Sequence, residues 1–274
     1  MWSDERTDMT DVEAKSGSAE RWGPLWGARP DDWALSEDQQ LPTYEAALER
    51  VDLKAGHRVL DIGCGAGAFL RLVSGRGARA FGLDASEALI ELARSRLPAA
   101  DLRVGEMEAL PYADDTFDLV TGFNAFFFAN DMVAALREAG RVAKRGAPVV
   151  IQVWGPYERR DLEAMMKIAH PYLPPRPADA PPEPEFWEPG VLEEIATEAG
   201  LEPGEAFDIT WAYEYADADA LGRAMMAPAG IAVLVGPDRE AEVRAAIVEG
   251  LVPFRTEQAS YRLQNEFRCL IARA

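Results

Sequence analysis

Short apolar runs alternate with amphipathic stretches through the first 154 residues of the chain. The runs have the length of buried strands and lie at 58–62, 78–83, 102–104, 117–121 and 148–154. Between them, apolar residues recur every three or four positions, which is typical of helices that cover a sheet. Strands that alternate with helices in this way predict a parallel sheet in an α/β fold.

The stretches between these strands predict helices with defined ends. Ser86 and Asp131 are placed to cap the helices after the second and fourth strands, because their side-chain oxygens can accept from the first free N–H groups. Two further helices are expected at 43–53 and 66–74.

Proline crowds the chain after the fifth strand. Eight prolines between 171 and 189 exclude a long helix there. We therefore expect 155–187 to be a proline-rich cap segment, with one helix near 159–169 followed by extended chain.

The last part of the chain, 188–274, predicts the rest of the core sheet. It contains a helical pattern at 189–199 and two long strand candidates at 205–215 and 260–271. The stretch between these strands is helical in pattern, which predicts a lid inserted at about 217–252. With the five earlier runs, the two strands make an expected total of seven.

The N-terminal region divides at about residue 20. Residues 1–20 contain six acidic and two basic side chains, so we expect a mobile acidic tail. Trp22, Trp26 and Trp33 follow within twelve positions and open the region 21–154. These tryptophans predict either helices pinned to the core or a flap over a ligand pocket.

The composition limits the classes of function. Apolar residues are 48% of the chain and its formal net charge is −19, so it can bury a large core but repels nucleic acid and anionic lipid. Two cysteines give no disulfide framework and no metal cluster. No run of about 18 apolar residues or signal peptide is present, so we expect no membrane association and a cytoplasmic location.

The chemistry is expected where the first strand ends, at Asp61-Ile62-Gly63-Cys64-Gly65-Ala66-Gly67. Alternate glycines allow a sharp turn and a close approach to a ligand, and the helix that follows attracts anions. Gly63-x-Gly65-x-x-Ala68 also satisfies the dinucleotide fingerprint, and Asp84 can hold ribose hydroxyls with either ligand. Asp61 favours a cofactor with an ammonium group, because its carboxylate repels a pyrophosphate.

Four motifs in order extend this pattern, at Val59–Gly67, Gly82–Ser86, Gly105–Tyr112 and Phe117–Asn124. With them, residues 40–154 resemble class I S-adenosylmethionine-dependent methyltransferases, in particular the small-molecule, ubiquinone/menaquinone-type (methyltransferase type 11-like) group. The resemblance implies a Rossmann-like, doubly wound, mostly parallel sheet. It also implies S-adenosyl-L-methionine as cofactor and S-adenosyl-L-homocysteine as its product.

The resemblance assigns roles to individual residues. It implies that Asp61, Gly63 and Gly65 contact the amino-acid end of the cofactor, with Cys64 in the same turn, and that Asp84 holds the ribose. Around the adenine and the sulfonium, the implied residues are Ala85, Glu106, Met107, Phe123 and Asn124.

The expected reaction is an in-line displacement on the sulfonium methyl by an oxygen, nitrogen, sulfur or carbon nucleophile. Alignment and exclusion of water supply much of the rate, and a base is needed only if the nucleophile must lose a proton. Many relatives carry a histidine where this chain has Phe126-Phe127-Phe128. His57 precedes the first strand at the far edge of the sheet, so His170 is the weak candidate and the catalytic residue stays unknown.

The substrate pocket is expected to be apolar. Phe126, Phe127, Phe128 and Trp154 follow the carboxyl ends of strands, where open α/β sheets bind ligands. This favours a small apolar or aromatic metabolite, typical of secondary metabolism. Trp211, Tyr213 and Tyr215 alternate along a strand, and either enter the lid or pack against a helix.

Two other functions stay open from the sequence. The absence of an evident base allows a catalytically silent, cofactor-binding regulatory protein on the same fold. The glycine pattern also allows a nicotinamide-dependent oxidoreductase. A homodimer is compatible with the sequence as well.

Overall fold

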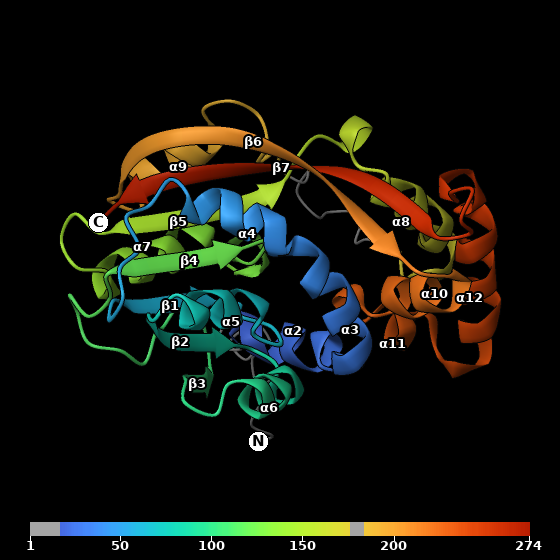
Figure 1. The fold of residues 1–274 in the computed structure, drawn as a ribbon, viewed down its shortest axis with the longest axis horizontal. Coiled ribbons are helices and arrows are strands. Elements are labelled where there is room, and N and C mark those ends of the chain that lie inside the picture. The colour runs from blue at the N-terminus through green and yellow to red at the C-terminus, as the bar shows by residue number, and fades with distance from the viewer. Residues whose placement is uncertain (1–16, 176–183) are drawn as a thin grey trace, which may run out of the picture.

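The computed structural model describes residues 17–175 and 184–274, and its centre is a seven-stranded sheet (Figure 1). The strand order is β3-β2-β1-β4-β5-β7-β6. The strands are β1 (Arg58–Ile62), β2 (Arg79–Asp84), β3 (Asp101–Val104), β4 (Leu119–Phe123), β5 (Pro148–Trp154), β6 (Glu202–Tyr215) and β7 (Tyr261–Arg273). Strands β1 to β5 pair in parallel, whereas β7 is antiparallel to β5 and to β6. The predicted α/β, doubly wound, mostly parallel fold is confirmed.

Helices cover both faces of the sheet because each presents an apolar stripe to it. One face packs against α4 (Leu41–Leu48), α5 (Ala68–Gly75) and α6 (Glu87–Arg96), and the other against α7 (Met132–Val142) and α9 (Val191–Glu198). The predicted caps are present: Ser86 accepts from the N–H of Leu89, and Asp131 from that of Ala134. Helix α4 ends at Leu48, five residues before the expected end.

A helical cap lies at the far end of the two long strands, β6 and β7 (Figure 1). Between these strands the chain forms α10 (Ala218–Met226), α11 (Ile231–Val235) and α12 (Pro237–Gly250), which share an apolar core with α8 (Leu162–Ala169). Single 3₁₀ turns lie at Asp38–Gln40 (η1), Phe126–Phe128 (η2), Tyr157–Arg159 (η3), His170–Tyr172 (η4), Pro228–Gly230 (η5) and Val252–Phe254 (η6). Residues 176–183 of the predicted cap segment lie outside the described residues.

The N-terminal segment, defined here as residues 18–37, forms α2 (Ser18–Trp26) and α3 (Pro30–Glu37). Helix α3 packs against α6 of the core and α10 of the cap, and it lies between the sheet and the cap (Figure 1). Residues 1–16 of the expected tail lie outside the described residues. Ser18–Glu20 form the first turn of α2, so the tail prediction is wrong for these three positions.

Across the described residues, no single helix is long and apolar enough to span a membrane. Helix α10 and the stretch Pro228–Val235 reach that length only as a pair bent by 71°. The buried apolar side chains of this pair, among them Leu221, Met225 and Ile231, belong to the core of the cap.

Candidate functional site

The glycine turn connects β1 to α5 at the point where the strand order reverses. Gly63 and Cys64 both donate from their backbone N–H groups to the carbonyl of Leu83, at 2.8 and 3.1 Å. Gly65 has φ +53°, and a Cβ there would lie 3.1 Å from both Glu37 Oε1 and Trp33 Nε1. The turn therefore requires glycine for its backbone conformation and for the close approach of α3.

Asp61 and Asp84 are buried on either side of this turn, 3% and 8% exposed. The hydroxyl of Thr121 donates to Asp61 at 2.6 Å. Asp84 accepts from the N–H groups of Gly65 and Ser86, at 2.9 and 2.8 Å. Burial raises the pKa of both carboxyl groups, because a low-dielectric environment disfavours the charged form. The two acids that the sequence singled out thus lie together at the turn.

Glu37 is a third buried acid at the turn, and the sequence analysis missed it. Its carboxylate accepts from the N–H groups of Ala66 and Ala68, both at 2.9 Å, at the N-terminus of α5. Burial, with 3% of the residue exposed, raises the pKa of Glu37 to about 7. Glu37 is one of several acids in its stretch of chain, and no spacing rule connects it to the glycine motif.

Two of the residues predicted to hold adenine, Glu106 and Ala85, lie against helix α2. The carboxylate of Glu106 accepts from Ser18 Oγ at 2.6 Å and from the Ala19 N–H at 2.8 Å. The carbonyl of Ala85 would lie 2.3 Å from a Cβ on Gly23, so the helix backbone touches it directly. Met107 packs against the core beside these residues.

The residues after β4 divide between the core and the site. Phe126 is 1% exposed and packs onto Gly122, where a Cβ would lie 2.3 Å from its ring. The structure therefore places Phe126 in the core, contrary to the expectation of a pocket residue. Phe123 is also buried, with its ring 4.5 Å from that of Tyr44.

The other predicted aromatic residues lie nearer the N-terminal segment and the cap. Phe128 makes edge contacts with Trp22 and Trp26, at ring distances of 4.9 and 5.4 Å. Phe127 stacks on Phe186 at 6.1 Å. The ring of Trp154 lies 4.8 Å from that of Phe267 in the cap core.

Several buried polar atoms have no hydrogen-bond partner in the described part of the chain. Two of them, Trp33 Nε1 on α3 and Asn124 Oδ1 after β4, lie near the turn, and a third, the hydroxyl of Tyr213 on β6, lies in the cap core. The amide of Asn124 donates to Gln40 at 3.1 Å, which leaves its oxygen unpaired. Because an unpaired buried polar atom costs roughly 1–3 kcal/mol, such atoms mark places where a ligand can complete the hydrogen bonding.

The alternating aromatic residues of β6 have different environments. Tyr213 and Tyr215 are buried, whereas Trp211 is exposed. The Tyr215 hydroxyl pairs with Ser36 Oγ of α3 at 3.1 Å. The side chain of Tyr213 packs in the cap core, so these residues both enter the cap and pack against a helix.

The two histidines lie away from the turn. His170 is exposed at the end of α8. The Nδ1 of His57 accepts from the Lys54 N–H, at the opposite edge of the sheet, as expected. Among the described residues, no group of three His, Cys, Asp or Glu side chains is arranged to hold a metal ion.

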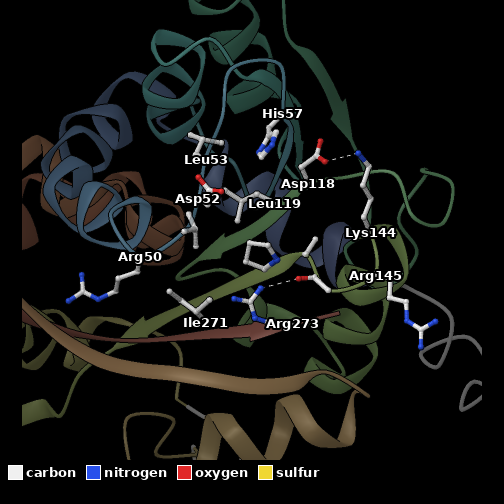
Figure 2. A pocket seen from close by; sticks show the side chains of 14 residues that line it. Arg50, Asp52, Leu53, His57, Asp118, Leu119, Lys144, Arg145, Ile271 and Arg273 are labelled. Atoms are coloured by element: carbon white, nitrogen blue, oxygen red, sulfur yellow. Dashed lines mark hydrogen bonds and ion pairs between the residues drawn. The ribbon is translucent and has the colours of Figure 1, made fainter.

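A basic cavity of about 440 Å³ opens beside His57 (Figure 2). Its charges are largely paired within the protein: Lys144 with Asp118 at 2.6 Å, and Arg50 with Glu205 at 3.2 Å. In Figure 2 the side chains of Arg50 and Arg145 point away from its centre. The cavity faces the amino-terminal ends of the strands, and the groups that carry the predicted chemistry are at the other ends.

Comparisons with known proteins agree with this geometry. Residues 60–151 match the family described as "Methyltransferase domain". The chain is 33% identical to methyltransferase GfsG of Streptomyces halstedii over 114 residues, which are 39% of this chain and 41% of that protein. It is 32% identical to the ubiquinone biosynthesis O-methyltransferase of Hahella chejuensis over 151 residues, 52% of this chain and 60% of that protein.

The fold is similar to that of a putative methyltransferase of Bacillus halodurans, with a TM-score of 0.56 and 15% identity over 85% of this chain and 98% of that one. The chain spans about half the length of the curated relatives named above. The family match at 60–151 includes the glycine turn.

Proposed function

Because the chain carries a class I S-adenosylmethionine-dependent methyltransferase domain with S-adenosyl-L-methionine as its cofactor, we propose that it methylates a small apolar or aromatic metabolite. One observation carries the proposal. The glycine turn, three buried carboxylates and the unpaired atoms Trp33 Nε1 and Asn124 Oδ1 surround the carboxyl end of β1. A cytoplasmic location, a secondary-metabolite substrate and the domain boundaries expected from the sequence stay part of this proposal.

The residues at the turn fit the cofactor chemically. S-adenosylmethionine carries positive charge on its ammonium and sulfonium groups, and buried carboxylates favour such a ligand. The unpaired oxygen of Asn124 can accept from an ammonium, and the unpaired indole N–H of Trp33 can donate to a carboxylate. The turn thus offers partners for both charged groups of an amino acid.

The binding roles follow the resemblance described above. Asp61, Gly63, Cys64 and Gly65 would hold the amino-acid end and Asp84 the ribose. The adenine and sulfonium ends would lie against Ala85, Glu106, Met107, Phe123 and Asn124. When bound, the cofactor supplies a methyl group that is already activated for displacement.

The chain's own residues would position the acceptor and exclude water. Phe127, Phe128 and Trp154 offer apolar surface for the substrate, while Phe126 supports the turn after β4 from the core. With both histidines away from the turn, positioning in an apolar site supports the transfer without an imidazole base.

The position of Glu37 supports this function over a nicotinamide-dependent oxidoreductase. A dinucleotide places its pyrophosphate on the N-terminal N–H groups of the helix after the glycine turn. In this chain Glu37 accepts from the N–H groups of Ala66 and Ala68 at that position. A buried carboxylate there repels a pyrophosphate.

The test is to incubate the purified protein with methyl-labelled S-adenosylmethionine and an extract of small metabolites. We expect label in an organic-extractable product, and calorimetric binding of S-adenosylhomocysteine but not of reduced nicotinamide dinucleotide. Binding of S-adenosylhomocysteine without any labelled product would favour the catalytically silent regulatory protein. Binding of the nicotinamide alone would refute the proposal.

A further inference from the structure

Glu37, Asp61 and Asp84 form a group of buried acids with no ion-paired base among the described residues. Two basic groups of this region have other partners: Arg96 donates to the carbonyl of Ala66 at 3.4 Å, and Arg71 pairs with Asp38. The negative charge of each acid makes ionisation of its neighbours less favourable. The charges of Glu37 and Asp84, for example, both raise the pKa of Asp61. Burying such charges is costly unless a positive group joins them.

We propose that Glu37 is a cofactor-binding residue supplied by the N-terminal segment, whose carboxylate interacts with the positive charge of the cofactor's amino-acid end and thereby keeps the segment closed over the cofactor. The inference rests on the proposed function and extends it to a residue outside the family match at 60–151. Glu37 Oε1 and the unpaired Trp33 Nε1 both lie 3.1 Å from the position of a Cβ on Gly65. Both side chains of α3 therefore face the backbone that holds the amino-acid end.

The proposed cofactor-binding residues after β1, β2 and β3 form a row from Gly65 at the glycine turn, past Asp84 and Ala85, to Glu106, because these strands are neighbours in the sheet. The N-terminal segment is attached at both ends of this row. At one end, Glu106 of the core accepts from Ser18 and Ala19 at the start of α2. At the other, Glu37 of the segment accepts from Ala66 and Ala68 at the start of α5. A carboxylate at a helix N-terminus is stabilised by the helix dipole, so electrostatics favours both attachments.

Between these two attachments the segment packs closely on the adenine side. A Cβ on Gly23 would lie 2.3 Å from the Ala85 carbonyl, and one on Gly27 would lie 2.5 Å from Ser86 Oγ. A bound cofactor in this row would be covered by α2 and α3. Entry and release then require the segment to move, and the charge of Glu37 links that movement to the charge of the ligand.

The same arrangement gives cofactor binding a pH dependence. The charged and titratable groups that influence Glu37 and its surroundings are Asp38 beside it, Arg96 on α6, Tyr44 on α4 and Asp61 on β1. Burial keeps Glu37 partly protonated near neutrality, and a cationic ligand favours its ionised form. Ligand affinity should therefore rise as the pH increases from 6 to 8.

The experiment compares two ligands by calorimetry at pH 8: S-adenosylhomocysteine, and 5′-methylthioadenosine, which lacks the amino-acid end. We expect Glu37→Gln to lower the affinity for S-adenosylhomocysteine about tenfold or more, because a charge-assisted contact is lost. The same substitution should change the affinity for 5′-methylthioadenosine by less than about threefold. Glu49→Gln, the same charge change at an exposed site directly after helix α4, should alter the affinity for neither ligand.

Hydrogen exchange over residues 18–37 gives a readout that is independent of turnover. S-adenosylhomocysteine should slow the amide exchange of this segment in the wild type and in Glu49→Gln. The slowing should be smaller in Glu37→Gln. Should Glu37→Gln not fold, the rise in wild-type affinity from pH 6 to 8 tests the same interaction, and a flat profile would overturn the inference.

Equal or tighter binding of S-adenosylhomocysteine by Glu37→Gln would overturn the inference while leaving the proposed function intact. An equal loss for both ligands would do so as well, because the effect would then be a general distortion of the site. A wild-type protein that binds neither ligand would contradict the proposed function itself.

Discussion

The carboxylate of Asp84 accepts a hydrogen bond from the backbone N–H of Gly65, at 2.9 Å. This contact joins the end of β2 to the glycine turn that follows β1. A second oxygen of the same carboxylate accepts from the Ser86 N–H at 2.8 Å. One side chain therefore both shapes the turn and remains at the position proposed for the ribose.

Replacing Asp84 tests that double role. Asp84→Ala should weaken S-adenosylhomocysteine binding by roughly 1.5–3 kcal/mol, because charge-assisted hydrogen bonds to the ribose are lost. Calorimetry measures the loss, with Asp52→Ala, an exposed acid paired to Lys54, as the control. Unchanged affinity in Asp84→Ala would remove this residue from the site.

Two glycines with positive φ allow the effect of backbone strain to be separated from the effect of a side chain that intrudes on the ligand site. Gly56 has φ +82° and no atom within 4 Å of the position that a Cβ would take, whereas Gly65 has φ +53° with Glu37 and Trp33 at 3.1 Å. Both alanine variants should lose roughly 1 kcal/mol of unfolding free energy through strain. Only Gly65→Ala should also lose S-adenosylhomocysteine affinity, and Gly65→Val should abolish binding in a folded protein. Similar affinities in the two alanine variants would mean that the turn does not approach the ligand.

The raised pKa of Glu37 predicts how stability changes with pH. A carboxyl group whose folded pKa of about 7 exceeds its ordinary value of 4.5 binds more protons when folded. Its contribution to stability is therefore present below about pH 4.5 and is lost as the pH rises toward 7. Between pH 5 and 8, the ligand-free wild type should lose up to about 3 kcal/mol more unfolding free energy than Glu37→Gln. Urea unfolding at several pH values measures this, and parallel profiles would show that Glu37 titrates normally.

Two neighbouring tyrosines on β6 predict opposite effects of losing a hydroxyl. The hydroxyl of Tyr213 is buried and has no partner among the described residues, whereas that of Tyr215 pairs with Ser36. Tyr213→Phe should therefore raise the unfolding free energy of the ligand-free protein by roughly 1 kcal/mol, and Tyr215→Phe should lower it by a similar amount. Chemical denaturation compares the two, and equal destabilisation would show that Tyr213 has a partner.

The positions of the histidines predict little imidazole catalysis. His170→Ala should slow single-turnover methyl transfer by less than about 100-fold, which is the smallest rate loss usually seen when a general base is removed. Trp154→Ala or Phe128→Ala should slow it more, because the acceptor loses its alignment. Rates are compared at saturating cofactor. A loss of two or more orders of magnitude in His170→Ala alone would identify His170 as the base.

Local features of this protein were determined by its sequence. The alternation of apolar runs and amphipathic stretches specified a parallel sheet, and Ser86 and Asp131 cap the helices that they precede. The glycine turn was also predicted, because Gly63, Gly65 and Gly67 follow the strand at alternate positions, and glycine adopts the positive φ that such a turn needs. Each cap is made within three positions of the chain, and the positive φ that the turn needs is a property of the glycines themselves, so residue types and their spacing are enough to predict both.

Only the tertiary structure decided which distant side chains meet at the turn. Glu37 reaches Ala66 and Ala68 across about thirty residues, and Ser18 reaches Glu106 across 88. Phe126 resembled its two neighbours in sequence but turned into the core, because Gly122 leaves space for its ring. Such contacts depend on how helices and strands pack, and the burial that raises the pKa of Glu37 exists only once α3 has packed against the glycine turn and the start of α5.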